Sequence, residues 1–171
     1  MASARSKSHH RRRVDAGVIA LVIIVCVLAA PITVSIVISL QNDAVARSVK
    51  DQLISLPLPP DSTLIDSYSE AGKLVGNGNG MQYLGAILIQ SELSTTELES
   101  HYQAQATVLD EARVSEYPVT ITVERGNATQ LSEIRSLSGF LAEADQAGRY
   151  VVYEWGYTSS WVLKDWDLRG H

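Results

Sequence analysis

Side chains able to bind a metal or transfer protons are few outside the first fifteen residues. His101 and His171 are the only histidines there, and Glu97 precedes His101 by one helical turn. Two histidines and one carboxylate can hold a zinc ion. However, Glu97 is also explained as a helix-capping acid, and His171, the last residue, need not be ordered. We therefore expect solvated histidines and assign no metal ligand.

Motifs of the common hydrolases are missing. The sequence contains no G-x-S-x-G, no S-x-x-K and no H-E-x-x-H. The single cysteine, Cys26, lies in a long apolar run, so the rest of the chain can form neither a disulfide nor a thiolate metal site. We assign no catalytic residue and no cofactor, and an enzymatic activity has no support.

An unusual glycine string, Gly76-Asn77-Gly78-Asn79-Gly80, supplies the candidate binding residues. Alternating glycines can form a nest of backbone N–H groups that holds an anion, as phosphate-binding loops do. Those loops lead from a strand into a helix, whereas this string leads into an apolar stretch at Met81. A hairpin loop with residues at positive φ is therefore the favoured interpretation, and the anion nest is the alternative.

Aromatic residues are frequent near the C-terminus. They are Tyr150, Tyr153, Trp155, Tyr157, Trp161 and Trp166. We expect most of them to pack in a core or across strands, while an exposed fraction would suit stacking on a glycan or contact with a protein.

Residues 16–40 contain no charged side chain, which predicts a membrane-spanning helix. A helix of this length spans about 37 Å, more than the ~30 Å hydrocarbon core of a bilayer. Five Lys or Arg residues precede the stretch, and only Arg47 and Lys50 occur in the fifteen residues after it. We therefore predict an uncleaved single-pass anchor in the plasma membrane with a cytoplasmic N-terminus. The alternative is a cleaved signal sequence, whose apolar part usually has about 7 to 15 residues.

Charge differs sharply between the two sides. The net charge of the chain is −5, and residues 1–15 contribute five basic residues and one acidic residue, so the remainder carries −9. An acidic domain lacks the basic surface that binds phosphate backbones, which argues against nucleic acid as a partner. The basic segment 1–15 is better explained as a cytoplasmic head that lies against anionic lipid of the bilayer.

The span is followed by a second amphipathic stretch. Apolar residues recur every four positions from Val45 to Leu53, which predicts a helical extension, and we favour a water-exposed extension over a helix lying on lipid. It should end near Ser55, because Leu56-Pro-Leu-Pro-Pro60 favours a stiff, extended spacer. Residues 41–60 are therefore assigned to a juxtamembrane helix and spacer, and residues 61–171 to one extracytoplasmic domain.

That domain is predicted to be α+β. Alternating or continuous apolar residues predict strands over 63–68, 81–91, 117–124 and 150–155, with a last strand over either 161–163 or 166–168. The first two strands should form an antiparallel hairpin. The fold class is thus an N-terminal transmembrane helix followed by a small, mostly antiparallel sheet with one or two helices on one face.

Two helical regions accompany the strands. Ser94 and Glu97 form an S-x-x-E capping box, which predicts a helix over 94–109 that packs on the sheet through Leu98. Residues 130–147 fit either a short helix closed at Gly148 or a strand over 134–141.

Four segments carry a resemblance to a group of small, actinobacterial-type, single-pass membrane-anchored proteins. They are Leu58-Pro-Pro-Asp-Ser-Thr63, Gly72-Lys-Leu-Val-Gly-Asn-Gly-Asn-Gly-Met81, the helix start at Ser94, and Asp167-Leu-Arg-Gly-His171. The resemblance implies a bacterial plasma-membrane anchor with an extracytoplasmic domain. It brings no catalytic residues.

We therefore predict a membrane-anchored extracytoplasmic binding or interaction module of the cell envelope, with an envelope protein or a cell-wall component as partner. The alternative is a membrane-tethered hydrolase or metal-dependent enzyme that uses His101 or His171. Several carboxylates or histidines with perturbed pKa values in one deep apolar pocket would favour the enzyme. A shallow surface would favour the binding module. The sequence specifies no oligomeric state.

Overall fold

A computed structural model of the chain describes residues 16–76, 80–112, 119–125, 129–156 and 166–170. The chain separates into two compact units, residues 1–34 and 35–171. In the first unit, residues 16–34 form the beginning of helix α1 (Ala16–Ser55), and all of their side chains are exposed. Among the described elements, α1 alone is long and apolar enough to cross a membrane. The predicted apolar helix is therefore present, and it fits a membrane anchor or a signal sequence.

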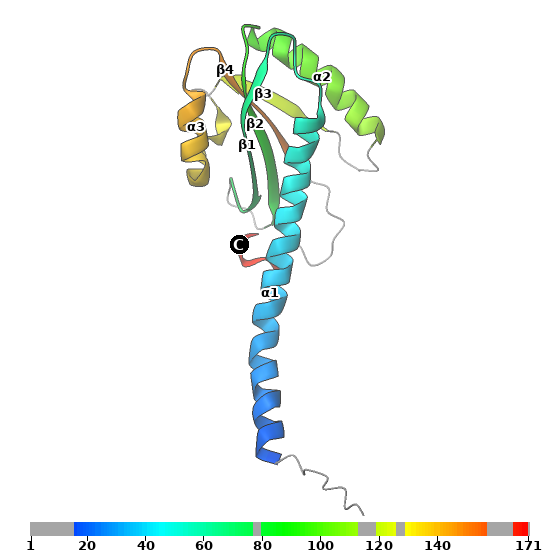
Figure 1. Ribbon diagram of the computed structural model, residues 1–171, viewed down its shortest axis with the longest axis vertical. Coiled ribbons are helices and arrows are strands. Elements are labelled where there is room, and N and C mark those ends of the chain that lie inside the picture. The colour runs from blue at the N-terminus through cyan, green and yellow to red at the C-terminus, as the bar shows by residue number, and fades with distance from the viewer. Residues whose placement is uncertain (1–15, 77–79, 113–118, 126–128, 157–165, 171) are drawn as a thin grey trace, which may run out of the picture. The chain divides into compact units, whose positions relative to one another are not determined.

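The second unit is built on a four-stranded antiparallel sheet in the order β1-β2-β4-β3 (Figure 1). The strands are β1 (Thr63–Gly72), β2 (Gln82–Gln90), β3 (Ile121–Arg125) and β4 (Arg149–Gly156), and the helices are α2 (Thr95–Ala112) and α3 (Ser138–Ala144). The predicted α+β class is confirmed, as are the β1–β2 hairpin and the central place of β2. Residues Tyr83–Ile89 of β2 are buried throughout, because both faces of this strand are covered.

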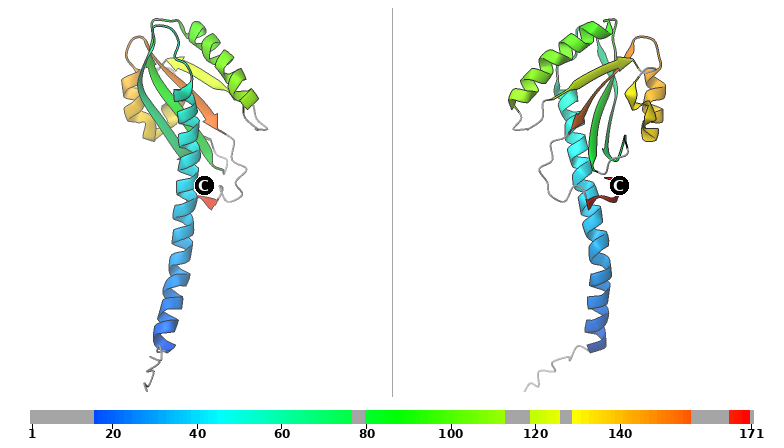
Figure 2. Two further views of the ribbon diagram at one scale, coloured as in Figure 1. Left: turned by 45° about the vertical axis from the view of Figure 1, so that its right-hand side comes forward. Right: turned by 180° about the vertical axis from the view of Figure 1, so that it is seen from behind.

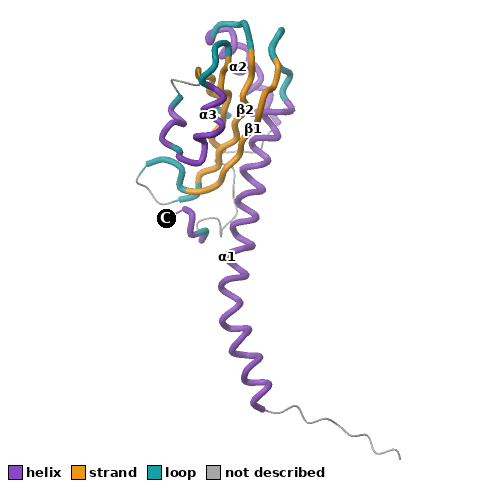
Figure 3. The backbone as a smooth tube through the Cα atoms, turned by 60° about the vertical axis from the view of Figure 1, so that its left-hand side comes forward, coloured by secondary structure: helices purple, strands orange, loops and turns teal. Residues whose placement is uncertain are grey.

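Helices cover both faces of the sheet, and the prediction that they share one face was wrong (Figures 2 and 3). Ile87 and Ile89 pack in one apolar cluster with residues of α1 and α2. Leu84, Ala86 and Leu88, which alternate with them along β2, pack in a second cluster with α3 and the segment before it. A strand with apolar side chains on both faces must be covered on both, since each exposed face would leave a large apolar area in water.

The second half of α1 forms part of this core. Asn42, Ala46, Val49 and Leu53 are at most 1% exposed, and Ile38 is 2% exposed. The helix ends at Ser55 as predicted, but its buried side chains replace the water-exposed extension that we expected. Leu56 and Pro59 of the predicted spacer are also buried. The compact unit thus begins at Ser35, whereas we had placed the start of the domain at Asp61.

Close approach between α1 and β2 depends on one glycine. A Cβ atom added to Gly85 would lie 2.5 Å from the backbone nitrogen of Lys50 and 2.8 Å from the carbonyl carbon of Val49. Only hydrogen fits there, so Gly85 lets the backbone of the helix rest directly on the strand.

The N-terminus of α2 has the predicted capping box. The backbone N–H of Ser94 donates to Oε2 of Glu97 over 2.8 Å, and the backbone N–H of Glu97 donates to Oγ of Ser94 over 3.4 Å. Leu98, in the first turn, is fully buried in the cluster beneath the helix. The predicted packing of α2 on the sheet through Leu98 is therefore confirmed.

Between β3 and β4 the short-helix interpretation is confirmed and the strand interpretation is wrong. Two 3₁₀ turns, Gln130–Glu133 and Arg135–Leu137, lead into α3, and Gly148 then adopts a φ of +75°. A strand over 166–168 is also wrong, because Leu168–Gly170 forms a 3₁₀ turn. The alternative over 161–163 lies outside the described residues.

Candidate binding site beside the glycine loop

The base of the glycine loop is closed by one amide side chain. Oε1 of Gln82 accepts hydrogen bonds from the backbone N–H groups of Leu74 and Val75, each over 2.8 Å. The Nε2 group of Gln82 donates to the carbonyl oxygen of Val75 over 3.0 Å. The first residue of β2 thus holds the chain that enters the loop.

The described glycines of this loop adopt left-handed backbone conformations. Gly76 has a φ of +82° and Gly80 a φ of +141°. Such values strain residues with a Cβ atom, which explains glycine here and agrees with the turn interpretation. Asn77, Gly78 and Asn79 lie outside the described residues, so their assignment to a binding site stays a prediction.

A hollow of about 380 Å³ lies beside this loop, and we call it the Trp155 hollow. Its lining residues come from the loop, β2, the 3₁₀ turn before α3, and β4. They are Val75, Gln82, Gln130, Ser132, Glu133 and Trp155. The lining therefore combines an indole ring with amide, hydroxyl and carboxylate groups.

Local interactions hold the polar wall of this hollow. The Oγ1 atom of Thr129 accepts a hydrogen bond from the backbone N–H of Leu131 over 3.1 Å and so caps the 3₁₀ turn. Leu131 is fully buried in the cluster on this face of the sheet. Because Leu131 points inward, its polar neighbours Gln130 and Ser132 are left exposed.

Trp155 forms the aromatic part of the hollow. It is opposite Leu84 in the sheet and packs partly against the α3 cluster. Its ring stands edge-on to Tyr153, with 6.5 Å between ring centroids and an interplanar angle of 86°. The sequence identified Trp155 as an aromatic residue of interest, but it did not identify Gln130 or Ser132. The local sequence feature that could have indicated the turn carrying them is the capping residue Thr129.

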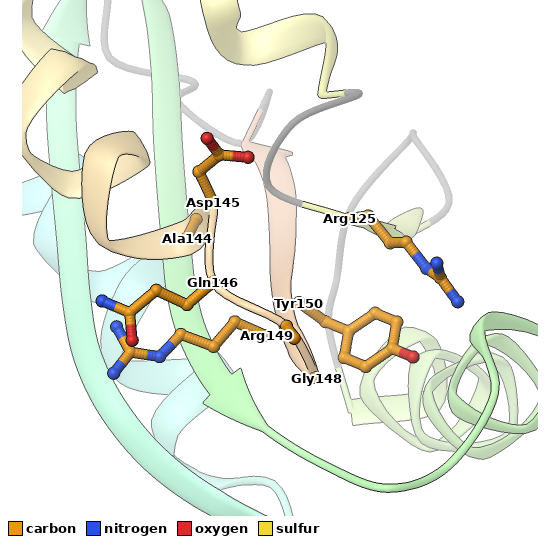
Figure 4. Close-up of a pocket in the computed structure, with 8 residues that line it drawn as sticks. Arg125, Ala144, Asp145, Gln146, Gly148, Arg149 and Tyr150 are labelled. Atoms are coloured by element: carbon orange, nitrogen blue, oxygen red, sulfur yellow. The ribbon is translucent and has the colours of Figure 1, made fainter.

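A second hollow, of about 350 Å³, lies at the turn between α3 and β4 (Figure 4). Arg125 lies above the ring of Tyr150, with 5.9 Å from its guanidinium carbon to the centroid. Arg149 extends away from Arg125 and Tyr150 in Figure 4, and its Nη1 donates to the carbonyl oxygen of Glu143 over 2.8 Å. Both arginines therefore already have contacts within the fold.

The residues considered for a metal site have structural partners. Nε2 of His101 lies 2.8 Å from the carbonyl oxygen of Pro57, to which it donates a hydrogen bond. Hydrogen bonds from the side chain and backbone of Ser94 lower the pKa of Glu97. Among the described residues, no three His, Cys, Asp or Glu side chains are grouped so that they could hold a metal ion. His171 lies outside the described residues.

Among the described residues, the two shortest ion pairs lie near the C-terminus. They belong to a group that we call the C-terminal clasp: Asn42, Asp43, Tyr83, Asp167 and Arg169. Nη1 of Arg169 is 2.7 Å from Oδ1 of Asp43, and Nη2 is 2.8 Å from Oδ2 of Asp167. Nδ2 of Asn42 donates to Oδ2 of Asp167 over 3.0 Å, and the hydroxyl of Tyr83 donates to Oδ1 of Asn42 over 2.8 Å. The clasp therefore joins the C-terminal segment to α1 and β2.

Electrostatics within the clasp favour the ionised carboxylate. Burial alone would raise the pKa of Asp167, which is 1% exposed. Hydrogen bonds from Arg169 and Asn42 outweigh that effect and lower the pKa to about 2. The same carboxylate raises the pKa of Arg169 above its ordinary value. This arrangement is well suited to holding the fold together.

Comparison with protein-family models, with curated proteins and with solved structures found no match. The resemblance to small membrane-anchored proteins stays a prediction.

Proposed function

We propose that this protein is an uncleaved, single-pass envelope protein whose acidic domain lies outside the plasma membrane and binds a cell-wall glycan in the Trp155 hollow. The observation that carries the proposal is the lining of the hollow. An indole ring can stack on the apolar face of a sugar, and amide, hydroxyl and carboxylate groups can bond its hydroxyl and acetamido groups. A volume of about 380 Å³ lies within the range of small-molecule sites.

The core packing of α1 supports an anchor over a cleaved signal sequence. Its buried residues begin at Ile38, inside the apolar stretch 16–40. Cleavage by a signal peptidase would remove this stretch from the mature protein. Cleavage after Leu40 would separate Ile38 and Ser39 from the domain, and the backbone carbonyl of Ser39 accepts a hydrogen bond from Arg169 over 3.0 Å. A retained helix keeps these contacts.

The composition of the hollow supports binding over hydrolysis. Most glycoside hydrolases need two carboxyl groups about 5 to 10 Å apart. Glu133 supplies the single carboxylate among the described lining residues. Among the described acidic residues, Glu97 and Asp167 have clearly shifted pKa values, and they lie instead in the capping box and the clasp.

Topology is tested with tags on both ends of the full chain. Protease added to intact cells or spheroplasts should remove a C-terminal tag and spare an N-terminal one. A mature protein that begins after Leu40 would contradict the anchor, and an N-terminal tag that is cut from outside would contradict the orientation.

Glycan binding is tested with the full chain in lipid nanodiscs and the N-acetylglucosamine disaccharide as the probe. We expect the indole N–H signal of Trp155 to shift in ¹⁵N NMR spectra. Replacing Trp155 by Leu, which removes the ring, should weaken binding about fivefold or more, because aromatic stacking contributes ~1 kcal/mol. Glu133→Gln should alter the affinity, and Glu92→Gln, at another exposed glutamate, should not. An unshifted indole signal, or equal affinities for all variants, would refute glycan binding in this hollow.

A further inference from the structure

Among the strands that the structure describes, β3 forms one edge of the sheet. Within the described part of the chain, β3 pairs only with β4, through five consecutive residue pairs. The other edge strand, β1, has an irregularity in its pairing between Leu64 and Asp66, a feature that hinders the addition of another strand. A regular edge such as β3 offers backbone N–H and C=O groups to an extended chain.

A groove of about 640 Å³ runs beside this edge, and we call it the edge groove. Three of its lining residues, Ile121, Thr122 and Val123, belong to β3. The other wall consists of exposed residues of α2, namely Glu99, Ser100, Gln103, Ala104 and Thr107. The last four recur at the spacing of a single helix face, while the neighbouring face of α2 packs in the core through Leu98 and Tyr102.

An edge strand next to a helix is an arrangement that recognises extended peptides. The peptide adds to the sheet through backbone hydrogen bonds, and alternate side chains enter the groove against the helix. The side chains of α2 at this wall are small or neutral except for Glu99, which makes no ion pair with any other described residue. The wall therefore accommodates small or β-branched side chains together with one basic residue.

A second copy of this chain fits the edge poorly. The second half of α1 runs in the same direction as β2, because Asn42 contacts Tyr83 and the later residue Val49 lies on Gly85. Since β2 and β3 are both antiparallel to β4, this part of α1 also runs in the direction of β3. Antiparallel pairing of two β3 strands places a two-fold axis perpendicular to the sheet. The two α1 helices would then run in opposite directions, so the two Ser35 ends would lie at opposite ends of the dimer. Two copies anchored in one membrane could not pair in this way.

We propose that an extended segment of another protein, with a basic residue among small or β-branched residues, adds to β3 in the edge groove. Glu99 pairs with the basic side chain, and the edge of β3 binds the backbone of the segment. This site is separate from the Trp155 hollow. It depends on the proposed anchor only for the exclusion of a second copy, so glycan binding and peptide binding can fail independently.

The test begins with a random nonapeptide library displayed against the full chain in nanodiscs, followed by synthesis of an enriched peptide. We expect enriched sequences to combine Lys or Arg with Thr, Val or Ile. Fluorescence anisotropy should show about two- to fivefold weaker binding to Glu99→Gln, the usual contribution of an exposed ion pair. The matched variant Glu92→Gln should bind like the wild type.

Backbone N-methylation distinguishes strand addition from simple charge attraction. Only alternate N–H groups of an added strand face β3, so methylation of one alternate set should abolish binding and methylation of the other should leave it within about threefold. Failure to enrich peptides, equal effects of the two methylated sets, or equal affinities for Glu99→Gln and Glu92→Gln would overturn the proposal. So would a dimer of the full chain that is broken by substitutions in β3.

Discussion

Replacing Arg169 by Gln should destabilise the second unit by leaving a buried carboxylate with fewer partners. Asp167 is 1% exposed, and its pKa of about 2 in the fold compares with an ordinary value of 3.8. That difference corresponds to about 2 kcal/mol of stabilisation from all of its partners together. The side chain of Arg169 is 40% exposed, so solvent screens part of its share. We therefore expect Arg169→Gln to lower the free energy of unfolding by about 1 to 2 kcal/mol.

The sign of the pH dependence follows from the lowered pKa of Asp167. A carboxyl group that ionises more readily in the fold stabilises it fully above the pKa of the unfolded chain, here 3.8. The contribution falls as the pH drops and is lost below about 2. The difference in stability between wild type and Arg169→Gln should therefore be present at pH 7 and shrink steadily from pH 4 towards pH 2.

Urea unfolding of the full chain in nanodiscs, followed by tryptophan fluorescence, measures this difference without adding salt. Arg135→Gln is the matched control, since Arg135 is an exposed arginine elsewhere in the same unit. The double variant Asp167→Asn/Arg169→Gln should lose less than the sum of the single variants, because it leaves no unpaired buried charge. A loss no larger than that of Arg135→Gln, or a difference that persists undiminished near pH 2, would show that charge pairing does not hold the clasp.

Local packing leads to four further predictions, each measured by thermal or urea unfolding of the full chain. Ser94→Ala should cost about 1 kcal/mol through loss of the helix cap, and Leu98→Ala about 2 to 5 kcal/mol because Leu98 is fully buried; a silent Leu98→Ala would contradict the observed packing of α2. Gly85→Ala should cost about 1 to 3 kcal/mol or more, since its Cβ would collide with the backbone nitrogen of Lys50 and the carbonyl carbon of Val49. Adding Val49→Ala should restore little of this stability, because both backbone atoms stay in place. Gly76→Ala should cost only about 1 kcal/mol, from backbone strain alone, because a Cβ there meets no atom of the described residues within 4 Å; a much larger loss would mean that the loop is packed.

The elements predicted best from the sequence are those whose causes lie within a few residues. The apolar helix needs only the absence of charge over residues 16–40, and the start of α2 needs only Ser94 and Glu97 three positions apart. The turn character of the glycine string likewise follows from backbone freedom at Gly76 and Gly80. These features involve short-range sterics and hydrogen bonds, which a sequence displays directly.

The candidate site was only partly predictable. Trp155 is conspicuous by type, and the glycine loop by composition. Gln130 and Ser132 are ordinary polar residues, and they reach the hollow only because the buried side chain of Leu131 orients the turn that carries them. The edge groove likewise requires the strand order, which places β3 rather than β4 at the edge.

Tertiary structure alone decided what the second half of α1 does. Its apolar residues at four-residue spacing are equally compatible with water, lipid or a core, because periodicity identifies a face but not what covers it. Here the sheet covers it, and the clasp fastens it through a hydrogen bond between Asn42 and Asp167, 125 positions apart in the chain. Pairing over such a distance depends on the path of every intervening element, so it appears only once the chain has folded.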